Sequence, residues 1–240
     1  MIQEKKCKPQ GQMKGIEGCG RLTDVRYIKY GACSNCYWNW MQENENGKVH
    51  YQKQFLPQAK AKVKKNERDQ KREQKINLLT ADQYRSKYLQ PTINKTARLI
   101  DFGCSCIATD NFGKMNGGHY RSVGSNRTIA LNLHNIHIQS FQSNTFRGGD
   151  DKNYKDGLID RYGIEYFDFV DALRQQKPLH LTLDDMKELN VKAKAINLTL
   201  EKQQTERIPE ERINLRNQVN KDLGIYDEQF STFKTEIRCK

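Results

Sequence analysis

The chain has 240 residues, of which 36% are hydrophobic and 29% charged, and its mean hydropathy is −0.92. This composition excludes one large apolar core and favours small modules joined by solvated helices. Lys and Arg outnumber Asp and Glu by 41 to 29, so the expected partner is a polyanion such as nucleic acid, with a merely soluble basic protein as the alternative.

No apolar stretch reaches the roughly 18 to 20 residues that span a bilayer, and the first residues lack the apolar region of a signal peptide. We therefore expect a cytoplasmic protein without a membrane partner. In a reducing compartment, the seven cysteines are better explained as metal ligands or free thiols than as disulfides.

Four cysteines lie near the start of the chain: Cys7, Cys19, Cys33 and Cys36. The last two form a C-x-x-C pair, which places two thiolates on one side of a tight turn, as a tetrahedral zinc ion requires. We predict a structural zinc module over residues 1–52, with free thiols as the alternative. A strand is expected after Cys19 and a helix after Cys36.

Residues 59–75 form a strongly basic segment, with eight basic and three acidic side chains. Few of them could pack in a core, so the segment is predicted to be a solvated helix that can lie along DNA phosphates. An ordinary exposed helix is the alternative. The residues assigned to the DNA contact are Lys64, Lys65, Arg68 and Lys71. With the helical pattern that follows, interrupted by Pro91, the segment makes up a basic helical linker over residues 53–98.

The stretch 103–144 has the residue types of a hydrolytic site. His119 follows two glycines, Asn135 lies sixteen residues later, and Asn144 lies nine residues beyond that. A histidine can take a proton from an attacking water, and an asparagine amide can orient a ring or bind a metal ion. Taken singly, each residue is also explained as a loop contact, a cap or a turn former.

This arrangement resembles the phage NinG (Rap) family of recombination nucleases. The resemblance rests on N-K-x-x-R-L-I-D before a cysteine pair, on G-H-Y-R-S-x-G, and on N-I-H-x-Q with a later Asn. It implies a ββα-metal (His-Me finger, HNH) module over residues 99–174. It also implies metal-dependent endonuclease cleavage of branched DNA, such as Holliday junctions and D-loops, in the host cytoplasm.

The resemblance implies roles for individual residues. His119 matches the general base, and Asn135 matches the residue whose side-chain carbonyl holds the imidazole in its working tautomer. Asn144 matches the helix residue that binds the catalytic Mg²⁺ or Mn²⁺, and His137 is expected to bind or orient the same cation. Arg121 is expected to contact a phosphate, with a surface ion pair as the alternative.

The sequence departs from the family pattern at two places. Gly118 stands where many HNH nucleases have an acidic metal ligand before the base. The family's nuclease module usually binds its own zinc through two C-x-x-C pairs, but here only Cys104 and Cys106 correspond to the first pair, and Ser140 and Ser143 replace the second. Serine is a poor zinc ligand, so this site is predicted to be lost and the module to be held by packing. The residues expected to pack are Phe102, Ile107, Leu131, Leu133, Ile136, Ile138 and Phe141.

The sequence thus predicts an α+β protein with a zinc module, a linker, a nuclease module and a helical C-terminal region over residues 175–240. Two short helices separated at Gly163 and a longer helix capped by Thr182 are expected. His134 and His180 are predicted at the surface, and Cys239 has no partner by spacing.

Two other functions fit the same residues: an HNH nuclease without structural preference, and an inactive, zinc-dependent nucleic-acid-binding protein. The second is favoured by the lost cysteines. Symmetric cleavage of a junction needs two active sites, so a homodimer is expected.

Overall fold

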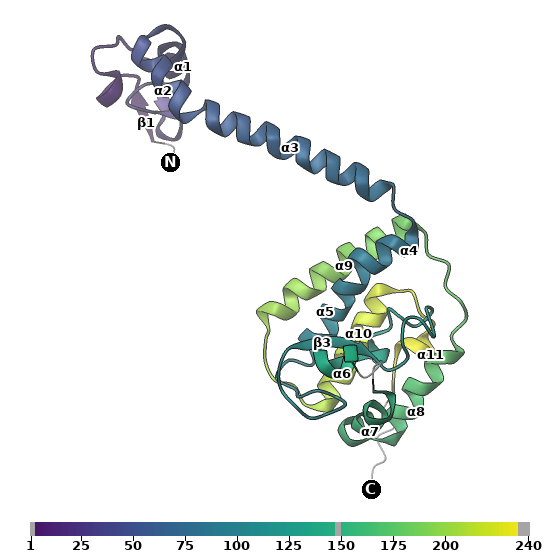
Figure 1. Ribbon diagram of the computed structural model, residues 1–240. Helices are drawn as coiled ribbons and strands as arrows, with labels where there is room; N and C mark the ends of the chain where they lie inside the picture. Colours follow the sequence, from purple (N-terminus) through teal and green to yellow (C-terminus); the bar gives the residue numbers. More distant parts are fainter. Residues whose placement is uncertain (1–2, 147–149, 235–240) are drawn as a thin grey trace. The chain divides into compact units, whose positions relative to one another are not determined.

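The computed structural model describes residues 3–146 and 150–234, so Cys239 lies outside the described residues. The chain divides into two compact units, Met1–Asn77 and Leu78–Lys240. Most of the described elements are helices, and the strands form two small antiparallel sheets (Figure 1). The predicted α+β class is confirmed at this level. In the described residues, no helix is both long enough and apolar enough to cross a membrane.

The first unit starts with a sheet in which β1 (Glu4–Lys6) pairs antiparallel with β2 (Leu22–Asp24). The strand predicted after Cys19 is present as β2, but it is short because a 3₁₀ turn begins at Val25. Helices α1 (Ser34–Glu43) and α2 (Glu45–Gln54) follow. Gly47 allows them to approach closely, since a Cβ there would lie 2.0 Å from the Trp40 carbonyl oxygen. The core of this unit is small and consists of Cys7, Met13, Ala32, Cys33, Tyr37, Trp40 and Met41.

The predicted basic segment is helical. It forms α3 (Leu56–Asn77), whose 22 residues correspond to about 33 Å of helix. None of its residues is buried, so α3 is a solvated helix, as expected. The predicted linker over residues 53–98 is divided between the two units, because the chain from Leu78 onward belongs to the second one.

The second unit begins with α4 (Ala81–Tyr84), a π-helical turn (Arg85–Leu89) and α5 (Gln90–Ile100). Pro91 lies in the first turn of α5, directly after the π-helical turn, and the helical run continues past it from Ala81 to Ile100. Helix α9 (Leu183–Lys202) lies along α5, and Thr182 caps it as predicted (Figure 1). The Thr92 hydroxyl joins the two helices by donating to Asn190 Oδ1 over 2.8 Å.

The hairpin of the second unit consists of β3 (Met115–His119) and β4 (Ile136–Ser140), paired antiparallel. Helix α5 packs against β3 at Gly117, where a Cβ would lie 2.6 Å from the Asn94 carbonyl oxygen. A short helix, α6 (Phe141–Phe146), follows β4 directly. Helices α7 (Asp151–Tyr162) and α8 (Ile164–Ala172) are separated at Gly163, as predicted, which has a left-handed φ of 91°.

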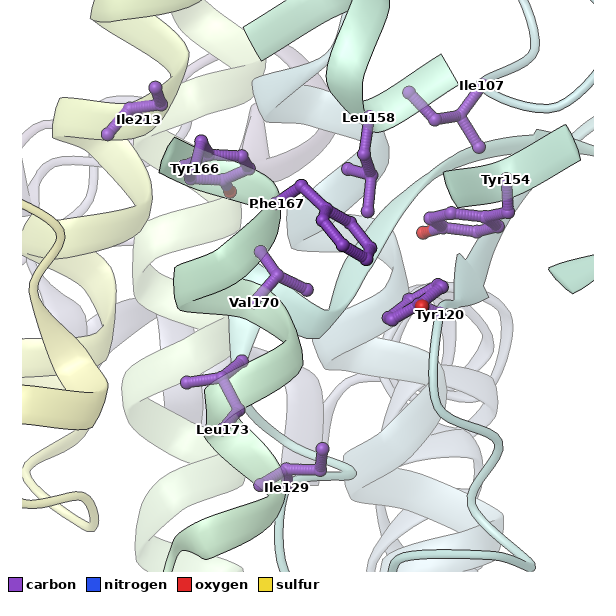
Figure 2. Packing of buried hydrophobic residues seen from close by; sticks show 10 residues of the cluster. All are labelled: Ile107, Tyr120, Ile129, Tyr154, Leu158, Tyr166, Phe167, Val170, Leu173 and Ile213. Atoms are coloured by element: carbon purple, nitrogen blue, oxygen red, sulfur yellow. The ribbon is translucent and has the colours of Figure 1, made fainter. Parts of the chain in front are cut away.

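Aromatic residues of α7 and α8 fill the space beside the hairpin (Figure 2). This cluster consists of Ile107, Tyr120, Ile129, Tyr154, Leu158, Tyr166, Phe167, Val170, Leu173 and Ile213. Five of the residues expected to pack are buried: Ile107, Leu131, Leu133, Ile136 and Ile138. Phe141 is only partly buried, and Phe102 is 39% exposed in the turn after α5. The packing prediction is therefore wrong for Phe102.

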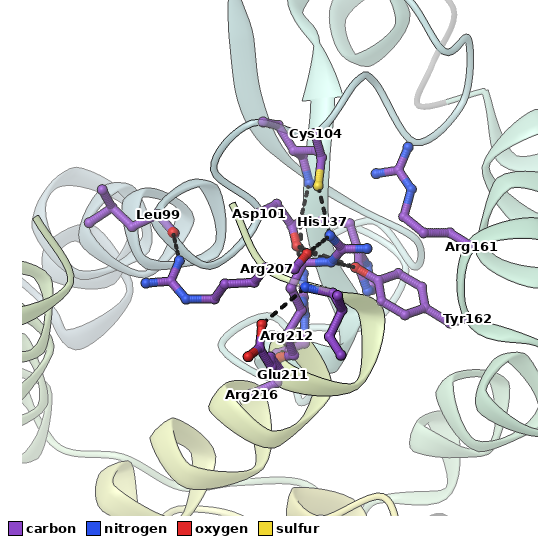
Figure 3. A network of polar contacts seen from close by, with 12 residues as sticks. Leu99, Asp101, Cys104, His137, Arg161, Tyr162, Arg207, Glu211, Arg212 and Arg216 are labelled. Atoms are coloured by element: carbon purple, nitrogen blue, oxygen red, sulfur yellow. Dashed lines mark hydrogen bonds and ion pairs between the residues drawn. The ribbon is translucent and has the colours of Figure 1, made fainter. Parts of the chain in front are cut away.

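A buried ion pair links α5 to α10 (Pro209–Leu223), which α11 (Glu228–Ser231) follows. The Arg216 guanidinium donates to both carboxylate oxygens of Asp101, over 2.8 and 2.7 Å, and both side chains are fully buried (Figure 3). Asp101 Oδ2 also accepts the Ile138 amide over 2.9 Å, which fixes β4 on α5. Arg216 Nε donates to the Leu133 carbonyl over 3.1 Å. Arg216 of α10 and Asp101 at the end of α5 therefore hold the chain before and within β4.

Candidate functional site

Four cysteine sulfurs meet in the first unit. They all lie within 4.8 Å of one another and belong to Cys7, Cys19, Cys33 and Cys36. Cys7 follows β1 and Cys19 precedes β2, while the C-x-x-C pair lies at the start of α1. Gly31 shapes the turn before this pair, because its φ of 74° is left-handed and a Cβ there would lie 2.1 Å from the Lys8 carbonyl oxygen.

The spacing of these sulfurs fits a tetrahedral zinc ion. Zn–S bonds of about 2.3 Å place two sulfurs about 3.8 Å apart, and the sulfurs of Cys19 and Cys33 lie 3.7 Å apart. The Cys33 amide donates to the Cys7 sulfur over 3.2 Å. The pKa of Cys19 is lowered to about 7, first by the Arg21 backbone amide and then by the side chains of Cys33 and Cys36. These four residues could therefore bind a zinc ion.

We expect one tightly bound zinc ion per chain, measured by elemental analysis after dialysis. Cys36→Ser should remove it and loosen α1, which the fluorescence of Trp38 and Trp40 on that helix would report. Cys104→Ser is the matched control and should retain the zinc. Two zinc ions per chain would mean that Cys104 or Cys106 also binds metal, and none would contradict the zinc module.

The later cysteines have separate partners. The buried Cys106 sulfur accepts a hydrogen bond from the Ser140 amide over 3.2 Å, whereas Arg212 Nη1 donates to the Cys104 sulfur over 3.1 Å. Ser143 is the second of the two serines that replace the family's later cysteine pair. Its hydroxyl accepts a hydrogen bond from Gln139 Nε2 over 3.1 Å. Hydrogen bonds therefore connect these segments where the sequence predicts the loss of a zinc site.

The predicted base, His119, is the last residue of β3 and pairs with Ile136. Its Nε2 atom lies 3.0 Å from the Ala130 carbonyl oxygen. A carbonyl oxygen can only accept, so this contact requires the proton on Nε2. In the neutral ring, Nδ1 is then unprotonated and is the atom that can accept a proton.

The surroundings of His119 keep its ring neutral. Burial lowers the pKa of His119, and the hydrogen bond to Ala130 opposes this shift without cancelling it. A pKa below the ordinary value of about 6.5 leaves the imidazole uncharged at pH 7. The residue as a whole is only partly buried, so His119 is desolvated without being enclosed in the core. These are the properties that a general base needs.

Asn135 holds the loop between the strands rather than the imidazole. Its Oδ1 accepts the Arg121 amide over 2.8 Å, and its Nδ2 donates to the Arg121 carbonyl over 3.0 Å. The sequence predicts that the Asn135 carbonyl orients His119, but the Ala130 carbonyl does so in the structure. Nothing in the sequence marks Ala130, because every residue has a backbone carbonyl.

Asn144 lies on α6 and is half-buried. Its side-chain amide has no hydrogen-bond partner among the described residues, so this group is available to a ligand. An amide oxygen suits Mg²⁺ or Mn²⁺, which are hard cations. These observations fit the predicted ligand role, although a single amide would supply only part of a coordination shell.

The two other histidines of this region lie in the core. Both ring nitrogens of His137 contact tyrosine hydroxyls: Nδ1 lies 3.2 Å from Tyr154 and Nε2 lies 3.3 Å from Tyr166. Neither nitrogen is left for the catalytic cation that the sequence predicts at His137. His134 is also fully buried, and burial lowers its pKa to about 3, so its predicted surface position is wrong. His180 is exposed, as predicted.

Gly118 has a steric explanation. A Cβ at this position would lie 2.0 Å from Gln139 Oε1 and 2.7 Å from Gln139 Cβ, so the Gln139 side chain fills the space that any residue larger than glycine would need. The Gly118 carbonyl accepts the Tyr154 hydroxyl over 2.9 Å. The acidic ligand that many HNH nucleases have before the base therefore has no room here.

Arg121 forms the ion pair that is the alternative to its predicted phosphate contact. Its guanidinium donates to the Asp171 carboxylate and lies 4.8 Å from the centre of the Tyr120 ring. Its Nε is buried and has no hydrogen-bond partner among the described residues. The ion pair given as the alternative is therefore present, and the phosphate contact of Arg121 stays a prediction.

Comparison with known proteins gives a match to one family model. The family model described as the Bacteriophage Lambda NinG protein matches residues 8–205. No curated protein and no solved structure matches the chain. The family match covers most of the chain, from the four-cysteine module through the hairpin to the end of α9. The chain therefore belongs to the NinG family, which implies a protein related to phage recombination.

Proposed function

We propose that this protein is a metal-dependent DNA endonuclease that cuts branched DNA during phage recombination. The observation that carries the proposal is the contact between His119 Nε2 and the Ala130 carbonyl, which requires the proton on Nε2 and leaves Nδ1 able to accept one at the end of β3. Burial also lowers the pKa of His119. Family membership supports the link to recombination. Helix α6, which carries Asn144, directly follows the second strand of the same hairpin.

In the proposed reaction, His119 Nδ1 accepts a proton from the water that attacks the phosphodiester. The Asn135 side chain bonds the Arg121 backbone and so closes the base of the loop between the two strands, which contains Ala130. Asn135 therefore acts as a positioning residue. The Asn144 amide oxygen would bind the divalent cation, and substrate oxygens and waters would complete the coordination shell. When bound, the cation would stabilise the negative charge that develops on the phosphate.

The DNA contact proposed for α3 is a stripe along one side of the helix. At 100° per residue, an arc of about 140° contains seven of the basic side chains in residues 59–75 and none of the acidic ones. We call this set the basic stripe; it consists of Lys60, Lys64, Lys65, Arg68, Lys71, Arg72 and Lys75. Because α3 has no buried residue, the whole stripe can lie along a row of phosphates.

We expect the triple variant Lys64→Gln, Arg68→Gln, Lys71→Gln to bind every DNA shape more weakly. The slope of log affinity against log salt should fall by about three, because each lost phosphate contact contributes about one. A matched variant also has Asn66→Lys, Gln70→Lys and Gln74→Lys, which restore the net charge on the other side of α3. Filter binding over a salt series should show that this matched variant binds DNA as weakly as the triple variant. If the charge-restored variant bound DNA with the parental affinity, net charge alone would matter. If both variants bound with the parental affinity, α3 would be an ordinary solvated helix without a DNA contact.

The proposed activity is tested with the purified chain, Mg²⁺ or Mn²⁺, and labelled four-way junction, flap, D-loop and duplex substrates. Cleavage of the branched substrates before duplex is the expected result. Equal cleavage of all substrates would favour an HNH nuclease without structural preference. DNA binding without cleavage under any divalent cation would favour the inactive binding protein, the alternative that Ser140 and Ser143 support.

A further inference from the structure

Gln90, the first residue of α5, has a side chain that reaches the candidate base. The side chain is buried, and its Nε2 lies 2.8 Å from the Ala130 carbonyl oxygen, 2.9 Å from Asn94 Oδ1 and 3.1 Å from His119 Nε2. The Ala130 carbonyl thus faces two nitrogens at once, one from Gln90 and one from His119.

The hydrogen-bond chemistry allows one arrangement of these groups. If the Gln90 amide were reversed, its oxygen would lie 2.8 Å from the Ala130 oxygen, where neither atom has a proton to donate. The amide nitrogen must therefore face Ala130, and its two protons go to Ala130 and Asn94. The two lone pairs of the Ala130 carbonyl are then used by Gln90 and by His119 Nε2–H.

This arrangement leaves an unpaired atom on the other side of the amide. Gln90 Oε1 is buried and has no hydrogen-bond partner among the described residues. A buried acceptor without a partner costs stability, so a residue that only filled space here would be better apolar. The cost is explained if the amide nitrogen is required where it stands.

We propose that Gln90 is a positioning residue for His119, because it holds the Ala130 carbonyl against Nε2 and so keeps Nδ1 unprotonated. The inference deepens the proposed function, since it rests on His119 as the base. It also explains why the residue is a neutral amide: a carboxylate at the same place would accept the Nε2 proton itself and stabilise the charged ring, which cannot act as a base.

The ring has neutral surroundings on every side described. Helix α5 contributes Gln90 and Asn94, the loop contributes Ala130, and β4 contributes Ile136 opposite His119. No acidic or basic side chain of the described residues forms a hydrogen bond or ion pair with the ring. Among the described residues, a charge placed at position 90 would therefore be the first charged side chain to hydrogen-bond the ring.

The test compares Gln90→Glu and Gln90→Met in the full chain. In protein labelled with ¹⁵N-histidine, His119 of the parent should be neutral with its proton on Nε2, and His119→Gln identifies its signals. Gln90→Glu should raise the pKa of His119 by about 1 to 3 units, the effect of an opposite charge in contact. The acid limb of the cleavage rate against pH should move up with it.

Gln90→Met keeps the length of the side chain but removes the donor. It should give a mixture of ring tautomers and lower kcat by about 10- to 100-fold with KM nearly unchanged, as other residues that orient a functional histidine do. Gln176→Glu is the matched control: Gln176 is also buried, its Oε1 also has no partner among the described residues, and it bonds the Lys177 carbonyl instead of Ala130. It should leave the tautomer and pKa of His119 unchanged.

A His119 that keeps its parental tautomer in Gln90→Met and its parental pKa in Gln90→Glu would overturn the inference, and so would an equal pKa shift in Gln176→Glu. The NMR measurement needs no activity, so the two proposals fail separately. If the NMR changes occur in a protein that never cleaves DNA, Gln90 positions His119 but the nuclease proposal is wrong. If the parent cleaves and Gln90→Glu leaves the pH profile unchanged, the nuclease stands without this role for Gln90.

Discussion

His119→Ala should abolish metal-dependent DNA cleavage and leave DNA binding nearly unchanged. The substitution removes Nδ1, the proposed proton acceptor, and no proposed phosphate contact. A general base contributes about 10²- to 10⁴-fold to a rate, so the loss should be plain in a gel assay of junction cleavage. Because His119 is only partly buried and its ring donates one hydrogen bond, to the Ala130 carbonyl, the fold should tolerate the loss of the ring.

Asn144→Ala should also lower cleavage, but high Mg²⁺ or Mn²⁺ should restore part of it. This variant loses a proposed metal ligand and keeps the base, whereas added metal cannot replace a missing proton acceptor. Thr145→Ala, next to it on α6 and exposed, is the control and should cleave like the parent. Junction cleavage at the parental rate by both His119→Ala and Asn144→Ala would refute the assignment of the active site.

Arg216→Met should lower the free energy of unfolding of the second unit by about 3–5 kcal/mol, the cost of leaving one partner of a buried ion pair alone. Burial by itself would lower the pKa of Arg216, but the Asp101 carboxylate raises it above its ordinary value, so the guanidinium is charged. The variant would leave the fully buried Asp101 carboxylate without its main partner. It would also free the carbonyls of Leu133 and Ile136, which Arg216 binds.

The matched control is Lys95→Met, which removes an exposed ion pair with Glu201 between α5 and α9. Exposed pairs contribute at most about 1 kcal/mol, so this variant should unfold close to the parent. Urea unfolding should be followed by near-UV circular dichroism of the tyrosines, because the two tryptophans, Trp38 and Trp40, lie in the first unit. Equal stability of Arg216→Met and Lys95→Met would show that the ion pair does not hold the C-terminal helices to the hairpin.

Several features of this protein were decided by residues close together in the sequence. The Thr182 cap, the break at Gly163 and the solvated basic helix depend on neighbouring residues, so their patterns predict them directly. The four-cysteine cluster is a similar case. Its sequence spacing is wide, but few arrangements other than a shared metal site explain four cysteines in so small a module, and their sulfurs do meet.

The hydrogen-bond partners of the polar residues were decided by the tertiary structure. His119, His134 and His137 are alike by residue type, yet one ends a strand half-buried and the other two contact the Tyr166 hydroxyl in the core. Their positions depend on where α8 packs, and no pattern within the N-I-H motif contains that information. The same holds for Asn135, whose partner is the Arg121 backbone fourteen residues earlier in the chain.

The longest-range contacts are the least readable from sequence. Asp101 belongs to the R-L-I-D motif, but its partner Arg216 lies 115 residues later and beyond the segment that the family model matches. The Ala130 carbonyl and the Gln90 amide come together at His119 from a loop and a helix 40 residues apart. Sequence patterns report local backbone preference and burial. These contacts form instead because a polar group that is buried by packing must find its hydrogen-bond partners among the residues that surround it in space.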